Sequence, residues 1–120
     1  ENGGCSMIVA PDGKIIKNYK PIEYGALMTE AESEVLRKLM AEVVNSGTGT
    51  RMKGYGYTAG GKTGSAEYNS NKEDSHAWFT GFAPAENPQI AITIIIEGAG
   101  AGGDYAVPMA RRVLDAYFKE

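Results

Sequence analysis

Glycine is concentrated in the middle of the chain. The eighteen residues 47–64 hold seven of them, at positions 47, 49, 54, 56, 60, 61 and 64. Glycine is unfavourable in helices and, having no Cβ atom, lets the backbone approach another group closely. The segment is therefore not expected to be helical, and its backbone is expected to lie close to another group.

An amphipathic helix is predicted just before this segment. Thr29 and Glu32 form a capping-box pair, in which each side chain accepts a hydrogen bond from the other residue's amide. Apolar residues then recur at helical spacing, at Val35, Leu36, Leu39, Met40 and Val43. Asn45-Ser46-Gly47 ends the pattern, with Gly47 expected as a left-handed cap.

Strand patterns lie on both sides of the predicted helix. Residues 6–9 and 14–16 flank Pro11-Asp12-Gly13, which is typical of a turn and predicts a hairpin. Farther along, residues 76–82 and the apolar run 90–96 read as strands. The run 90–96 has no charged residue, which favours a strand covered on both faces.

A second helix is expected at the end of the chain. Asp104 is its expected N-cap, and Pro108 falls in the first turn, where its missing N–H is tolerated. Its apolar stripe comprises Val107, Ala110, Val113, Leu114 and Tyr117. Short connections favour antiparallel pairing, so the predicted class is α+β, with helices packed on an antiparallel sheet. Trp78, Phe79 and Phe82 are expected in its core.

Composition narrows the choice of function. A chain of 120 residues is enough for one domain. The net charge is −3 and the basic residues are scattered, so nucleic acid is not an expected partner. One cysteine and one histidine cannot build a zinc centre, and we predict no metal and no cofactor. The chain opens Glu1-Asn2-Gly3-Gly4 without Met, which we interpret as part of a longer protein.

One motif admits two interpretations. Residues 56–63 match the phosphate-loop pattern G-x-x-x-x-G-K-[ST]. That pattern binds nucleotides between a buried strand and a helix, and neither flank has the required character. Nucleotide binding through Gly56–Thr63 remains an alternative. The other interpretation takes Lys62-Thr63-Gly64 as a strand that borders a catalytic cleft.

The flanks of this triplet carry a resemblance. Val43-Val44-Asn45-Ser46-Gly47-Thr48-Gly49-Thr50 precedes it, and His76-Ala77-Trp78-Phe79-Thr80-Gly81-Phe82-Ala83-Pro84 follows it. Together with the triplet, the stretch 88–92 and the closing helix, these segments resemble the class B penicillin-binding proteins, which are cell-wall transpeptidases. The resemblance covers nearly all of residues 1–120. It implies a partial serine β-lactamase and penicillin-binding fold, without the helical subdomain and the first sheet strands.

The resemblance also implies roles for four residues. The backbone amide of Ser65 would form part of an oxyanion hole, and the Thr63 hydroxyl would bind a substrate carboxylate. Lys62 would add positive potential and assist proton movement, and Gly64 would let the strand approach the ligand. The implied ligands are a peptidoglycan stem peptide and β-lactams. The implied location is outside a bacterial cytoplasmic membrane, to which the parent protein is anchored.

The nucleophile of this family is missing from the sequence. None of the serines has Lys three positions later or Asn two positions later; they are Ser6, Ser33, Ser46, Ser65, Ser70 and Ser75. We therefore expect the parent to be a D,D-transpeptidase and this chain to be inactive alone. A β-lactamase or β-lactam sensor of the same fold, and a non-catalytic interaction module, are the alternatives.

Three further expectations concern neighbouring residues. His76 is expected to make a structural hydrogen bond at a strand end. Tyr55 and Tyr57 either line the cleft or pack within the loop. Because the family's sheet continues beside the strand 90–96, that edge would be open here, and we expect the chain to associate with itself there.

Overall fold

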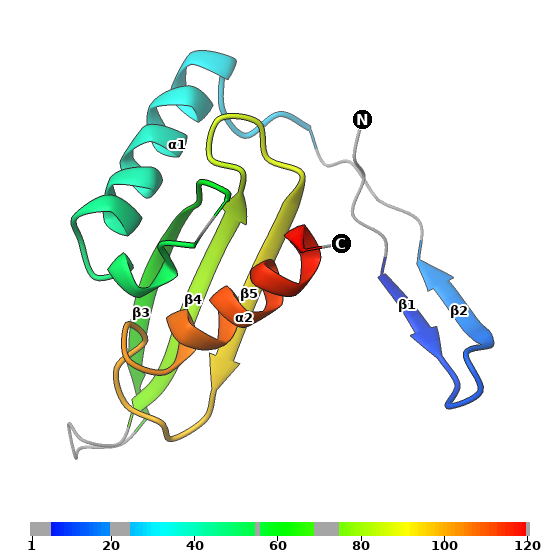
Figure 1. The fold of residues 1–120 in the computed structure, drawn as a ribbon. Helices are drawn as coiled ribbons and strands as arrows, with labels where there is room; N and C mark the ends of the chain where they lie inside the picture. The colour runs from blue at the N-terminus through cyan, green and yellow to red at the C-terminus, as the bar shows by residue number, and fades with distance from the viewer. Residues whose placement is uncertain (1–5, 20–24, 55, 69–74, 120) are drawn as a thin grey trace.

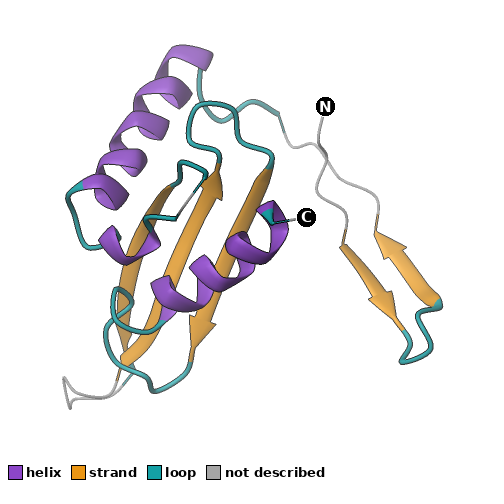
Figure 2. Ribbon diagram, viewed as in Figure 1, coloured by secondary structure: helices purple, strands orange, loops and turns teal. Residues whose placement is uncertain are grey.

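The computed structural model describes residues 6–19, 25–54, 56–68 and 75–119. In chain order the elements are β1 (Ser6–Val9), β2 (Ile15–Tyr19), α1 (Glu30–Asn45), the 3₁₀ turn η1 (Thr50–Met52), β3 (Gly60–Glu67), β4 (Ser75–Ala83), β5 (Ile90–Ile96) and α2 (Ala106–Phe118). The predicted α+β class and order of elements are confirmed (Figures 1 and 2). Tyr55 and Cys5 lie outside the described residues.

The strands form two separate sheets. β3, β4 and β5 are antiparallel and lie side by side in that order, with Thr63 opposite Phe79 and Phe79 opposite Ile94. β1 and β2 form the predicted hairpin, which stands apart from the larger sheet (Figure 1). Asp12 closes its turn by accepting a hydrogen bond from the Lys14 amide at 3.0 Å.

The core lies between the three-stranded sheet and α2. β4 places Phe79 and its neighbours Ala77 and Ala83 against α2, which contributes Val107 and Leu114. All five side chains are buried. α1 packs against β3, and α2 crosses β4 and β5, so both helices hold the sheet (Figure 2). The buried face fixes the register of β3, which carries the candidate site.

The predicted capping box at the start of α1 is confirmed, but the cap predicted at its end is not. The Thr29 amide donates to Glu32 at 2.8 Å and the Glu32 amide donates to Thr29 Oγ1 at 3.3 Å, which completes the capping box. Gly47 does not adopt a positive φ, so the predicted left-handed cap is wrong. The amides of Gly47 and Gly49 both donate to the Val43 carbonyl instead, at 3.1 and 3.0 Å. Glycine fits at position 47 because a Cβ atom there would lie 3.0 Å from the Val43 backbone.

Part of the apolar stripe of α1 is exposed. Val35, Leu36 and Leu39 face solvent, and Leu39 is 61% exposed. The face that packs on the sheet lies farther around the helix and includes the buried Val44. Periodicity located the helix correctly, but it did not reveal which part of the stripe is covered.

The predicted burial of β5 and Trp78 is also wrong in part. Along β5, partly buried residues alternate with exposed ones, because α2 covers only one of its faces. Trp78 points away from that covered face and is 37% exposed, whereas its neighbour Phe79 is buried. An apolar run alone does not distinguish one covered face from two.

α2 starts slightly later than predicted. Its N-cap is Tyr105, whose side chain makes no capping hydrogen bond, and the Asp104 carboxylate pairs with Arg51 instead. Pro108 does fall in the first turn, as expected. Val113 and Tyr117, which were assigned to the apolar stripe, are exposed. Within the described ranges, neither helix combines the length and apolar character needed to cross a bilayer.

Truncating Leu114 tests whether the interface between α2 and the sheet forms the core. Leu114 is 0% exposed, and Val113, on the same helix, is 42% exposed. We expect Leu114→Ala to lower the free energy of unfolding by about 2–5 kcal/mol, because it leaves a cavity. Val113→Ala, the matched control, should change it by less than about 1 kcal/mol. Urea unfolding followed by circular dichroism measures both, and equal effects would contradict this core.

Candidate functional site: a cleft beside strand β3

The four predicted site residues lie together in the middle of β3, which borders an open cleft of about 610 Å³. The cleft is lined by Lys62, Thr63, Gly64 and Ser65 from β3, by Thr48, Thr50 and Arg51 from the turn after α1, and by residues 101–104 from the loop before α2. Segments far apart in sequence therefore meet at this strand.

Among the described strands β3 pairs only with β4, and its other edge has no strand beside it where β3 borders the cleft. In an antiparallel strand, the N–H and C=O of one residue point to the same side, and those of the next residue point to the opposite side. Residues two positions apart therefore direct these groups to the same side. The Thr63 carbonyl accepts a hydrogen bond from Lys62 Nζ at 2.6 Å, which indicates that it points away from β4. Ser65, two residues later, must then direct its amide to the same open side.

Two hydroxyl groups meet in the lining of the cleft. Thr63 Oγ1 lies 2.6 Å from Thr48 Oγ1, and either oxygen can be the donor. Thr63 is half-buried and Thr48 is exposed. Lys62 is exposed, and it donates to the neutral carbonyl of Thr63, a contact that does not neutralise its positive charge.

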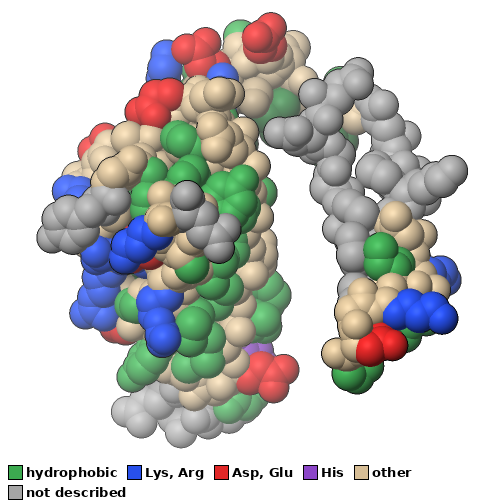
Figure 3. Space-filling model, turned by 45° about the vertical axis from the view of Figure 1, so that its right-hand side comes forward, with side chains coloured by type: hydrophobic (Ala, Val, Ile, Leu, Met, Phe, Trp, Pro, Cys, Tyr) green, Lys and Arg blue, Asp and Glu red, His purple; other side chains and the backbone are tan. Residues whose placement is uncertain are grey.

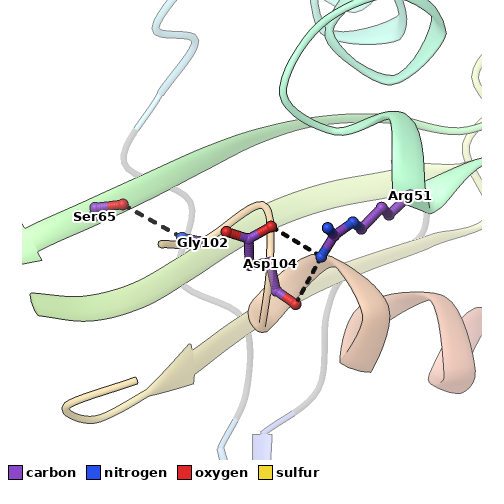
Figure 4. Close-up of polar contacts among 4 residues, drawn as sticks. All are labelled: Arg51, Ser65, Gly102 and Asp104. Carbon is purple, nitrogen blue, oxygen red and sulfur yellow. Dashed lines mark hydrogen bonds and ion pairs between the residues drawn. The ribbon is translucent and has the colours of Figure 1, made fainter. Parts of the chain in front are cut away.

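The side chain of Ser65 holds the loop before α2. Its Oγ accepts a hydrogen bond from the Gly102 amide at 3.3 Å (Figure 4). Gly102 sits directly on the backbone of β3 and β4, and a Cβ atom there would overlap the carbonyl oxygens of Gly64 and Trp78. Only glycine lets the loop approach the sheet this closely.

An ion pair closes the far side of the cleft. Arg51 Nη1 lies 2.9 Å from Asp104 Oδ1 and also donates to the Asp104 carbonyl at 3.3 Å (Figure 4). Both side chains are more than half exposed, so the pair contributes less than about 1 kcal/mol. Sequence analysis missed this pair because its partners are far apart in the chain and neither belongs to a recognisable motif.

Tyr57 packs within the fold and does not line the cleft. Its ring stacks on Phe118 with ring centroids 4.8 Å apart, and its hydroxyl donates to Asp115 at 2.8 Å. Burial, with a smaller contribution from Asp115, raises the pKa of the Tyr57 hydroxyl. The stacking and the hydrogen bond hold the segment before β3 against α2. Of the two roles expected for Tyr57, the structure thus supports packing within the loop.

His76 makes the structural hydrogen bond that the sequence predicted. Its Nδ1 accepts from the Gly98 amide at 3.0 Å, and its ring stacks on Tyr68 at 4.5 Å. The histidine therefore holds the start of the loop that returns to the cleft through Gly102.

The nucleotide-binding alternative is wrong. A phosphate loop connects a buried strand to a helix, whose first amides hold the phosphates. Here Gly60–Thr63 lie inside β3, and the next element is strand β4. These four residues of the motif are therefore extended and cannot wrap around a phosphate.

Comparison with known proteins identifies the family. The model of the penicillin-binding protein transpeptidase domain matches residues 13–115. The chain belongs to this family. Peptidoglycan D,D-transpeptidase MrdA of Haemophilus influenzae is 34% identical over 133 aligned positions, which cover 95% of this chain and 20% of that protein.

Solved transpeptidase structures share the fold. The D,D-transpeptidase domain of a peptidoglycan glycosyltransferase from Eggerthella lenta superposes with a TM-score of 0.73 at 27% identity, covering 94% of this chain and 26% of that one. Penicillin-binding protein A from M. tuberculosis, as its ceftriaxone acyl-enzyme complex, gives 0.71 at 25% identity, covering 96% of this chain and 29% of that one. The chain thus spans about a fifth of the length of MrdA. The predicted membership of the class B penicillin-binding protein family is confirmed.

Gly102→Ala tests the contact between the loop before α2 and β3. We expect a loss of about 1–3 kcal/mol in the free energy of unfolding, because the added methyl group forces the loop off the sheet. The amide resonances of Gly64 and Ser65 should shift as well. Ala101→Ser, at the exposed neighbouring position, should stay within about 0.5 kcal/mol of wild type. A Gly102→Ala chain as stable as wild type, with unchanged resonances, would rule out the contact.

Proposed function

We propose that this chain forms one wall of the active site of a D,D-transpeptidase, which cross-links peptidoglycan stem peptides by serine acyl transfer and is acylated by β-lactams. The observation that carries the proposal is the open edge of β3, where Thr63 and Ser65 border the cleft with Lys62 beside them. Two comparisons support it. A 34% identical relative is named a D,D-transpeptidase, and a structural relative forms an acyl-enzyme with ceftriaxone.

Ser65 supplies one half of an oxyanion hole through its backbone. Attack on a carbonyl places negative charge on the carbonyl oxygen, and amides aimed at that oxygen stabilise it. The alternation of β3 directs the Ser65 amide toward the cleft. Its side chain is occupied with the Gly102 amide, so backbone and hydroxyl perform separate tasks.

Thr63 and Lys62 recognise the carboxylate of the substrate or of a β-lactam. The Thr63 hydroxyl, which lines the cleft, donates to this carboxylate, and the ammonium of Lys62 adds a favourable potential. A Cβ atom at Gly64 would lie 3.3 Å from the Trp78 Cβ, so glycine keeps the strand flat against β4 behind the ligand.

The nucleophile comes from residues outside this sequence. No serine in the chain has the Ser-x-x-Lys or Ser-x-Asn spacing, so the chain alone cannot form an acyl-enzyme. The complete transpeptidase is anchored in a bacterial cytoplasmic membrane, with this domain on the outer side. The run Trp78–Pro84 and the Gly47–Thr50 turn favour a transpeptidase over a β-lactamase or a sensor of the same fold.

Labelling with a fluorescent penicillin tests the proposal. The chain alone should show no covalent adduct. Substituted for the matching stretch of H. influenzae MrdA, it should support acylation of the serine that the MrdA segment provides. In that chimera Thr63→Val should lower the acylation rate constant roughly 10- to 100-fold, because a hydrogen bond to a charged group is lost.

Thr93→Val is the matched control. Thr93 lies on β5, two strands from the cleft, and its hydroxyl also contacts another threonine, Thr80, at 3.0 Å. The acylation rate constant of the Thr93→Val chimera should equal that of the unmodified chimera. A covalent adduct on the chain alone, or equal rates for Thr63→Val and Thr93→Val, would contradict the proposed function.

We also propose that the isolated chain associates with a second copy through β5. Among the described strands β5 pairs only with β4, and its seven residues include no charge and no proline. Such an edge readily adds a further strand. Hydrophobic side chains gather along the side of the main body that carries β5 and α2 (Figure 3).

Sedimentation equilibrium measures this association. Wild type should form dimers at high concentration, and Ile95→Lys should remain monomeric because it places a charge on the edge strand. Ile95 is 45% exposed, so the change should not disturb the core. Leu39→Lys, at an exposed site on α1, is the control and should still dimerise. Monomeric wild type, or equal behaviour of the two variants, would exclude pairing through β5.

A further inference from the structure

Thr48 contacts the residue proposed to bind the carboxylate. Its hydroxyl oxygen lies 2.6 Å from Thr63 Oγ1, although the two residues are fifteen positions apart. Thr48 lies between α1 and η1, whereas Thr63 lies in β3, so the contact joins the turn after α1 to the strand. Both residues line the cleft.

The number of protons on the two hydroxyls decides which of them donates the hydrogen bond when Thr63 binds a carboxylate. A threonine hydroxyl has one proton to donate and two lone pairs to accept. To donate to a carboxylate, Thr63 must keep its proton free, so its contact with Thr48 must be one in which Thr63 accepts. Thr48 is then the donor, and the Thr63 proton can point only into the remaining space of the cleft.

The backbone at Thr48 is held firmly enough to fix such a direction. On either side of it, the Gly47 and Gly49 amides both donate to the Val43 carbonyl at the end of α1. The Met52 amide donates to Gly49 at 2.8 Å, and the Met52 side chain is fully buried. From the other side, Gly103 packs closely on the Thr48 carbonyl, and a Cβ atom there would lie 2.8 Å from that oxygen.

The ion pair between Arg51 and Asp104 also holds the turn that carries Thr48 against the loop before α2. Arg51, three residues after Thr48, binds Asp104, next to Gly103. The turn that carries Thr48 and the loop that packs on it are therefore tied together at two places. These contacts hold the Thr48 backbone in place, so its hydroxyl group can orient the Thr63 side chain.

We propose that Thr48 is a positioning residue, which donates its hydroxyl proton to Thr63 and thereby directs the Thr63 proton at the ligand carboxylate. The proposal rests on the proposed function, in which Thr63 binds that carboxylate. Thr48 itself does not touch the ligand, and its effect is exerted entirely through Thr63.

The MrdA chimera carrying the full chain tests this role with two ligands. Thr48→Val keeps the shape of the side chain and removes its proton. We expect acylation by a penicillin with a free carboxylate to slow about three- to tenfold, as for loss of one neutral hydrogen bond. Acylation by the penicillin methyl ester should not change, and Thr48→Ser should restore the wild-type rate. If Thr48→Val lowers the unfolding midpoint, Thr48→Ala takes its place.

A double variant separates positioning from direct binding. Because Thr48 acts through Thr63, Thr48→Val combined with Thr63→Val should be no slower than Thr63→Val alone. Additive effects, an equal loss with the methyl ester, or a wild-type rate for Thr48→Val would each overturn the positioning role. Failure of the proposed function looks different, because Thr63→Val itself would then have no effect on acylation by the free carboxylate form.

Discussion

The cleft depends on a strand that, within the part of the chain the structure describes, is paired on one side only. β3 bonds to β4 along its whole length, and its other edge is left open to the cleft. Antiparallel geometry then directs the backbone of Thr63 and Ser65 outward without any help from side chains. The proposed chemistry of the site thus starts from a main-chain property, and the side chains of these residues are free for other contacts.

Close backbone packing then shapes the cleft around this edge. Gly102 lies on the carbonyl groups of Gly64 and Trp78, and Gly103 lies on that of Thr48. Both approaches are possible only without a Cβ atom. The hydrogen bond from Gly102 to Ser65 and the ion pair between Arg51 and Asp104 add direction to this packing. The ion pair is exposed and the hydrogen bond to Ser65 is only partly buried, so close packing is the main restraint and the polar groups set the orientation.

Local sequence patterns predicted the elements well. The capping box at Thr29, the hairpin turn at Asp12 and the apolar run 90–96 each lie where a short-range rule places them. The same patterns did not predict burial. Val35, Leu36 and Leu39 have the spacing of a buried stripe, yet they are exposed, because burial depends on which neighbour covers a face and periodicity carries no such information.

The sequence by itself determined the family, the order of the elements and the place of Lys62-Thr63-Gly64 in a strand, because these follow from residues close together in the chain. Only the tertiary structure decided what surrounds that strand. Thr48, Arg51, Gly102 and Asp104 meet beside β3 through contacts between separate elements. Asp104 shows the difference most directly. Its position before α2 indicated an N-cap, but the fold brings Arg51 within 2.9 Å, and the carboxylate pairs with that charge.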